Sequence, residues 1–146
     1  VYDYLGFPVV PDIVPGKGAL GGIYTGLVHA RSEYIFCVAC DMPALNQRLI
    51  RYMQHSTNGY DVVVPKTPDG LHPLHAVYSK RCQPVIEALL HQNLLKISAM
   101  FPLLSTSYIL PREIQQFDPG FESFLNVNTA EDLHKAQTRY EPGKSG

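Results

Sequence analysis

The sequence YIFCVAC at residues 34–40 is apolar or aromatic throughout. A strand with one face in water alternates apolar and polar residues, whereas a strand covered on both faces reads as a continuous apolar run. We therefore predict that residues 34–40 form a buried strand of a parallel sheet. Ligands bind such sheets at the carboxyl ends of the strands, and Asp41 stands directly at the end of this one.

Strand and helix patterns alternate along the rest of the chain, which predicts the α/β class with a mostly parallel sheet. Further extended segments are expected at 9–10, 60–65, 74–79, 107–111 and 124–128. Helices are expected at 19–30, 45–53, 85–90, 96–104 and 129–137. Asn46 is suited to cap the second helix, and Thr129 with Asp132 has capping-box spacing at the last one. The residues TPDG at 67–70 predict a turn.

Length and charge limit the class of protein. The 146 residues, of which 45% are hydrophobic, suit one domain, expected at 1–139, with a disordered tail at 140–146. The net charge of -1 offers no basic field for nucleic acid or an anionic membrane. No apolar run reaches the roughly 18 residues of a membrane span, no signal peptide pattern is seen, and the 3 cysteines are an odd number. A cytoplasmic protein with reduced thiols is expected.

Asp41 is the first candidate for chemistry. A carboxylate at the carboxyl end of a buried strand can hold Mg²⁺ while substrate phosphates and waters fill the other coordination positions. Aspartate is also common in the turns that follow strands, so its position alone leaves a purely structural role open.

The residues GKGALGG offer a second interpretation. Gly16, Gly18 and Gly21 have the G-x-G-x-x-G spacing of an NAD-binding Rossmann loop, and Asp41 follows one strand later. Pro11 and Pro15 interrupt the run that leads to this loop, and proline is excluded from central strands, which argues against the NAD interpretation. Lys17 and the N–H groups near Gly18 are alternatively suited to a phosphate.

Two further sets of residues have the chemistry of a binding site. Cys37, Cys40, His72 and His75 are ligand types that zinc accepts, but strand periodicity places the two cysteines on opposite faces, so we expect them to be small buried side chains. Asn126 and Asn128 lie two apart before a helix start, where both amides could complete a metal shell, contact a substrate or stabilise a turn.

Five segments together, in order and spacing, resemble the molybdenum cofactor guanylyltransferase family of MobA-like nucleotidyltransferases. They are Asp12 in PD, then PGKGALGGIYTGL, CDMP, DGLHPLHAVY and FLNVNTAEDL, and they cover residues 9–136. The resemblance implies a three-layer α/β fold and an enzyme that joins the GMP part of GTP to molybdopterin, with release of pyrophosphate. A related transferase that uses CTP or another acceptor, and a non-enzymatic nucleotide-binding remnant, are the alternatives.

The resemblance also implies roles for individual residues. Asp41 would bind Mg²⁺, or Mn²⁺ in its place, and Asp12, Lys17 and Gly18 would join it in binding the nucleotide. Asn126 and Asn128 would take part in catalysis on the acceptor side, and His72 and Pro73 would line the acceptor side of the cleft. The implied partners are GTP and the molybdopterin cofactor, together with molybdoenzymes or other proteins of the cofactor pathway.

The chain differs from the family pattern at its start. The family begins with a strand that leads into L-A-G-G-x-S-x-R-M-G and a lysine, the loop that binds the triphosphate and the base. The chain from Val1 onward has no such sequence. We therefore expect the domain to be incomplete at its N-terminus, without a central strand. The chain by itself is expected to have little or no transferase activity.

Overall fold

The computed structural model describes residues 3–4, 7–13, 18–39 and 45–125. Its sheet is built around β3 (Tyr34–Ala39), which pairs parallel with β2 (Phe7–Ile13) and antiparallel with β6 (His75–Ser79). Beyond β6 lies β4 (Val62–Thr67), antiparallel to β6 and parallel to β7 (Thr106–Ile109). Two short strands, β1 (Asp3–Tyr4) and β5 (Gly70–Leu71), pair antiparallel with β2 and β4. Strands β2, β3, β4 and β7 thus run in one direction and β6 runs against them.

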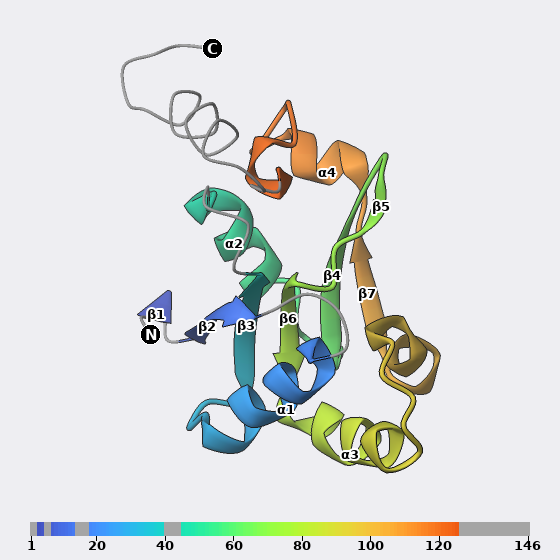
Figure 1. The fold of residues 1–146 in the computed structure, drawn as a ribbon. Helices are drawn as coiled ribbons and strands as arrows, with labels where there is room; N and C mark the ends of the chain where they lie inside the picture. Colours follow the sequence, from blue (N-terminus) through green and yellow to red (C-terminus); the bar gives the residue numbers. More distant parts are fainter. Residues whose placement is uncertain (1–2, 5–6, 14–17, 40–44, 126–146) are drawn as a thin grey trace.

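Helices cover both faces of this sheet, which confirms the three-layer α/β prediction (Figure 1). One face carries α1 (Ala19–His29), α3 (Gln83–His91) and the 3-10 helix η2 (Ile97–Leu103). The other face carries α2 (Gln47–Gln54), α4 (Pro111–Gln115) and the 3-10 helix η3 (Glu122–Phe124). A further 3-10 turn, η1 (Lys80–Cys82), joins β6 to α3. None of the helices in these described ranges has the length and apolar character to cross a bilayer.

The strand predicted to be buried on both faces is β3. Ile35 and Cys37 belong to the core under α1 and α3, whereas Phe36 and Val38 belong to the core under α2 and α4. All four side chains are at most 4% exposed. The unbroken apolar sequence follows from this arrangement, because neither face of the strand meets water.

The first predicted extended segment is longer than expected, and the predicted interruption at Pro11 is wrong. Instead of residues 9–10 alone, β2 continues through Pro8 and Pro11 to Ile13. Its register against β3 shifts between Val10 and Ile13, so Pro11 lies in an irregular part of the ladder. Proline is tolerated at such bulges and near sheet edges, where its missing N–H costs no ladder bond.

Helix α1 lies close to the sheet because two glycines face β2 and β3. A Cβ atom at Gly26 would lie 3.0 Å from Val10 Cγ2 and 3.2 Å from Ile35 Cδ1, and one at Gly22 would lie 3.3 Å from Ile13 Cδ1. A Cβ atom at either position would crowd these valine and isoleucine side chains. The glycines that lower the intrinsic stability of α1 therefore permit its tertiary packing.

The remaining elements match the sequence predictions with two corrections. Asn46 caps α2 as expected, its Oδ1 accepting from the Leu49 N–H at 3.0 Å, and TPDG forms the β4–β5 turn. The strand expected at 107–111 ends at Ile109, because Pro111 starts α4. Phe124, expected to be extended, lies in η3. The helix expected at 129–137 and the tail lie outside the described residues, so the domain boundary at 139 stays a prediction.

Candidate active site

The carboxyl edge of the sheet brings together segments that lie far apart in the sequence. β2 ends at Ile13 and β3 ends at Ala39, and these two residues are register partners. β6 starts at the same edge, where the Ala39 N–H donates to the Leu74 carbonyl at 2.9 Å. The connections that leave β2 and β3 hold the predicted Lys17 and Asp41, and both residues lie outside the described ranges. The edge matches the position at which parallel α/β sheets bind ligands.

Helix α1 begins beside this edge. Gly18 is its N-cap residue and is exposed, and among the described residues no side chain caps the first N–H groups of the helix. Free N–H groups at a helix start are suited to an anion such as a phosphate. Asp12 lies within β2, one residue before the end of the strand, although its side chain is not described. The structure therefore brings Asp12 and Gly18 to the same edge as the end of β3.

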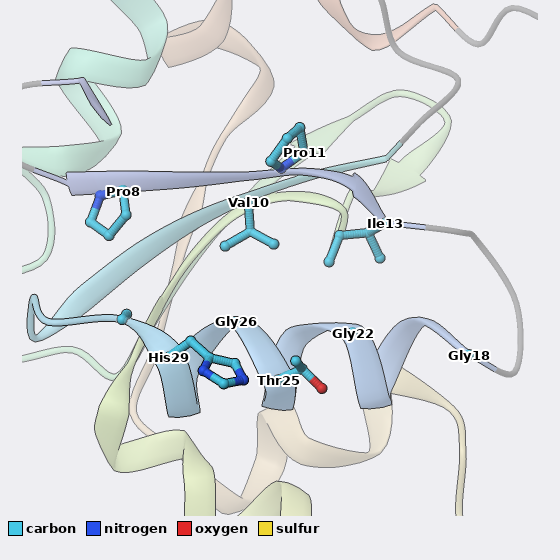
Figure 2. Close-up of a pocket in the computed structure, with 10 residues that line it drawn as sticks. Pro8, Val10, Pro11, Ile13, Gly18, Gly22, Thr25, Gly26 and His29 are labelled. Atoms are coloured by element: carbon cyan, nitrogen blue, oxygen red, sulfur yellow. The ribbon is translucent and has the colours of Figure 1, made fainter. Parts of the chain in front are cut away.

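A groove extends from Gly18 along the outer side of β2 and α1. It has a volume of about 580 Å³ and is mostly apolar, with Pro8, Val10, Ile13, Gly22 and Gly26 among its lining residues. Figure 2 shows Val10 and Ile13 pointing at the glycine side of α1. Because this lining offers few polar groups, the groove itself is unsuited to a triphosphate.

His72 lies in the connection between β5 and β6, and its ring is fixed from two sides. Its Nε2 lies 2.7 Å from the hydroxyl oxygen of Thr67 at the end of β4. The ring also packs on Phe124, with 4.6 Å between the ring centres. Partial burial lowers the pKa of His72, against a smaller opposing effect of Asp69. His72 is therefore a neutral side chain at neutral pH, able to donate one hydrogen bond and accept another.

Phe124 is itself positioned by a buried aspartate. Asp118, only 6% exposed, accepts hydrogen bonds from the Glu122 and Ser123 N–H groups at 3.0 Å each and from the Ser123 hydroxyl at 2.5 Å. These bonds fold the chain into η3 and direct Phe124 at the two histidines of the β5–β6 connection. A carboxylate that accepts several hydrogen bonds from one turn is a structural group, not a free acid.

His75 belongs to the core and not to the cleft. Its ring is fully buried, lies 4.5 Å from the Phe124 ring centre and meets Phe36 edge-on at 5.3 Å. Neither ring nitrogen has a partner among the residues that the structure describes. Burial lowers the pKa of His75 to about 3, with a smaller contribution from His72. The side chain therefore stays neutral at physiological pH.

The zinc alternative gains no support from these positions. Cys37 is buried on the α1 face of β3, whereas His75 packs against Phe36 on the opposite face. Burial raises the pKa of the Cys37 thiol well above its usual range, so it acts as a small apolar side chain, as expected. Cys40 lies outside the described residues. Within the described ranges, no three His, Cys, Asp or Glu side chains gather in a way that could hold a metal ion.

His72 and Pro73, predicted together on the acceptor side, face different surroundings. The Pro73 carbonyl accepts from the Tyr78 hydroxyl at 2.5 Å, and Pro73 lines a groove of about 540 Å³ with Lys96 and Phe101. Phe101 belongs to the core under α1, whereas Phe124, which touches His72, belongs to the other core. The two residues therefore lie on opposite sides of the sheet edge.

Sequence reasoning missed Thr67, Asp118 and Phe124 as supports of His72. Thr67 opens the predicted TPDG turn, and a hydroxyl at that position commonly bonds the N–H two residues later, as it does here with Asp69 at 3.2 Å. No comparable signal connects Phe124 with His72 across such a sequence distance. Asn126 and Asn128, predicted as catalytic, lie outside the described residues.

Comparisons with known proteins agree with this architecture. The profile of the family described as MobA-like NTP transferase domain matches residues 1–102. The chain is 41% identical to the molybdenum cofactor guanylyltransferase of Desulfosudis oleivorans, over 97% of this chain and 72% of that protein. It is 39% identical to a probable molybdenum cofactor guanylyltransferase of Pelotomaculum thermopropionicum, over 97% of this chain and 69% of the relative.

Solved structures give the same result. Molybdopterin-guanine dinucleotide biosynthesis protein A from Archaeoglobus fulgidus superposes with a TM-score of 0.71 at 27% identity, covering 82% of this chain and 61% of that one. A putative protein from Aquifex aeolicus superposes with a TM-score of 0.65 at 29% identity, covering 84% of this chain and 62% of that one. The chain thus spans less than two thirds of these solved structures. The sequence matches and the shared fold show that the chain belongs to the MobA-like NTP transferase domain family.

Proposed function

We propose that this protein transfers the GMP part of GTP to the molybdopterin cofactor and releases pyrophosphate. The observation that carries the proposal is the 41% identity to a molybdenum cofactor guanylyltransferase along nearly the whole chain. The geometry is compatible with it, because β2, β3 and α1 place their connections at one edge of the sheet. The NAD-binding alternative is not retained, because the matched family is a nucleotidyltransferase domain.

Phosphoryl transfer requires little covalent chemistry from the protein. It depends on alignment of the two substrates and on neutralising the charge that develops on the phosphates. In this proposal Lys17 and the N–H groups that follow Gly18 contact the phosphates of GTP, and Asp12 contacts its guanosine end. Neutral His72 on the acceptor side holds the molybdopterin through hydrogen bonds without adding charge.

In this proposal the divalent metal is bound by residues that lie outside the described ranges. His72 Nε2 is occupied by Thr67, and His75 is enclosed between aromatic rings, so neither His72 Nε2 nor His75 is open to the ion. Asp41 would hold Mg²⁺ or Mn²⁺, with Asn126 and Asn128 nearby on the acceptor side. When bound, the ion neutralises phosphate charge. We also propose that the protein acts in the cytoplasm and that molybdoenzymes are its downstream partners.

A nucleotide panel tests this function. The full-length protein is incubated with molybdopterin, Mg²⁺ and one of GTP, CTP, ATP or NAD, and pyrophosphate and the dinucleotide product are measured. GTP is expected to give both products, and omission of Mg²⁺ is expected to abolish them. Turnover with CTP in place of GTP would overturn the assignment of guanine. Absence of transfer with any nucleotide, in a folded protein that binds GTP, would overturn the enzyme assignment.

A further inference from the structure

Within the described part of the chain, the hydroxyl proton of Thr67 has one acceptor. The side chain is 3% exposed, at the junction of β4 and the turn to β5. Its oxygen accepts the Asp69 N–H at 3.2 Å and lies 2.7 Å from His72 Nε2. Among the described residues these are the contacts of this hydroxyl, so its own proton has His72 Nε2 as its acceptor.

This arrangement decides the tautomer of His72. If Nε2 carried the proton of the neutral ring, it would have to donate to Thr67, and the buried hydroxyl proton would lose its acceptor. An unpaired buried donor is costly enough to disfavour that state by about tenfold or more. When Nε2 accepts from Thr67 instead, the ring proton must lie on Nδ1.

Other contacts hold the ring in this orientation. The His72 N–H donates to the Pro65 carbonyl at 3.0 Å and the His72 carbonyl accepts from the His75 N–H at 3.1 Å, so the backbone is fixed on both sides of the ring. Phe124 covers one ring face. Nδ1 has no hydrogen-bond partner among the described residues, and the ring is only half buried. Its N–H is free to donate to a ligand.

We infer that Thr67 is a positioning residue that holds neutral His72 in the Nδ1–H tautomer. His72 then donates a hydrogen bond from Nδ1 to an oxygen atom of the bound substrate that receives the GMP group. The inference rests on the proposed function for the identity of that substrate. The recognised chemistry is an anionic or carbonyl oxygen, which accepts from an N–H. A group that only donates would be rejected at this position.

The tautomer can be measured without any assay of activity. Nitrogen NMR of ¹⁵N-histidine-labelled protein distinguishes a protonated ring nitrogen from an unprotonated one, at about pH 8 where the imidazole is neutral. His72 is expected to show a protonated Nδ1 and an unprotonated Nε2. Thr67→Val is expected to shift this population toward Nε2–H, and Thr67→Ser is expected to keep the original state. A protonated Nε2 in the unmodified protein, or an unchanged tautomer in Thr67→Val, would overturn the inference.

Kinetics then separate positioning from general stability. In the full-length protein Thr67→Val is expected to raise the KM for the acceptor severalfold, because the Nδ1–H tautomer is then only a fraction of the population, and to leave the KM for GTP unchanged. Thr106→Val is the matched control, because its hydroxyl also donates a hydrogen bond, in this case to the Phe101 carbonyl at 3.2 Å, but is not bonded to a histidine.

A second pair of variants tests which nitrogen matters. His72→Asn places an amide N–H near the position of Nδ1, whereas His72→Gln places one near Nε2. The asparagine variant is expected to retain more affinity for the acceptor than the glutamine variant, and the reverse order would overturn the inference. If the tautomer behaves as expected while neither variant changes acceptor binding, the positioning by Thr67 stands but the donation to substrate is wrong.

Discussion

Replacement of Gly26 by alanine tests the close contact between α1 and the strands that lead to the site. Alanine favours a helix over glycine by about 1 kcal/mol, so the substitution would stabilise a freely exposed helix. Here the added Cβ would lie 3.0 Å from Val10 Cγ2 and 3.2 Å from Ile35 Cδ1, whereas carbon atoms in good contact are about 3.5–4.0 Å apart. Overpacking of this kind costs about 1–3 kcal/mol.

Gly21 is the matched control in the same helix. A Cβ atom there meets nothing within 4 Å, so Gly21→Ala is expected to stabilise the protein by about 0.5–1 kcal/mol. For Gly26→Ala the two effects oppose each other, and we expect a change between zero and a loss of about 2 kcal/mol. The free energies of unfolding are measured by urea denaturation, with the same m-value (the dependence of the free energy on urea concentration) fitted for all variants. If Gly26→Ala stabilised the protein as much as Gly21→Ala, the close approach of α1 to β2 and β3 would be refuted.

Three further predictions concern the supports of the site. Asp118→Asn should lower the free energy of unfolding, measured in urea, by about 1–3 kcal/mol, because an amide cannot accept all three hydrogen bonds that form η3. The same variant should weaken the contact between the Phe124 and His72 rings, which NMR can measure. An unchanged stability would contradict the buried turn. Folding lowers the pKa of His75 to about 3, so as pH drops the unfolded state binds a proton before the folded state does. The free energy of unfolding should therefore fall between about pH 6.5 and pH 3, by about 1.4 kcal/mol per pH unit from this group. His75→Phe should flatten that fall, and an equally steep fall in the variant would contradict the assignment. Asn46→Ala should cost about 1 kcal/mol or more in urea unfolding, because both its cap of α2 and its bond to the Phe117 carbonyl at 2.8 Å are lost, and a neutral effect would contradict both roles.

The sequence predicted the elements whose pattern depends on local burial. The apolar run at 34–40 indicated β3 because each of its faces meets a core, and Asn46 indicated the start of α2 because its side chain bonds a nearby N–H. The pattern at 107–111 predicts Pro111 as the end of a strand, although proline is equally suited to the first turn of a helix. Glu113 supplied a second signal for α4, since its carboxylate accepts from the Leu110 N–H at 3.0 Å.

The direction of β6 could also be predicted from the sequence. The connection from β4 to β6 spans residues 68–74, which is too short for the crossover that a parallel neighbour needs. That short connection forces β6 to run against β4 and puts His72 at the carboxyl edge. The support of His72 by Phe124 could not be predicted, because it depends on how α4 and η3 pack over the sheet and not on any local pattern.

The central claim is that the carboxyl edge of the sheet transfers a nucleotide with the help of a metal held by Asp41. Single-turnover transfer of GMP to molybdopterin, measured with Mg²⁺ in the full-length protein, tests it through Asp41→Asn. Glu33→Gln is the control, because it removes the same charge from a half-exposed carboxylate. Glu33 contacts Arg81 at 3.3 Å and lies beside the start of β3, at the edge of the sheet opposite to the end of β3. We expect Asp41→Asn to slow transfer by about a hundredfold or more without changing the melting temperature, and Glu33→Gln to transfer at the unmodified rate. Transfer by folded Asp41→Asn at the rate of the unmodified protein would contradict the account.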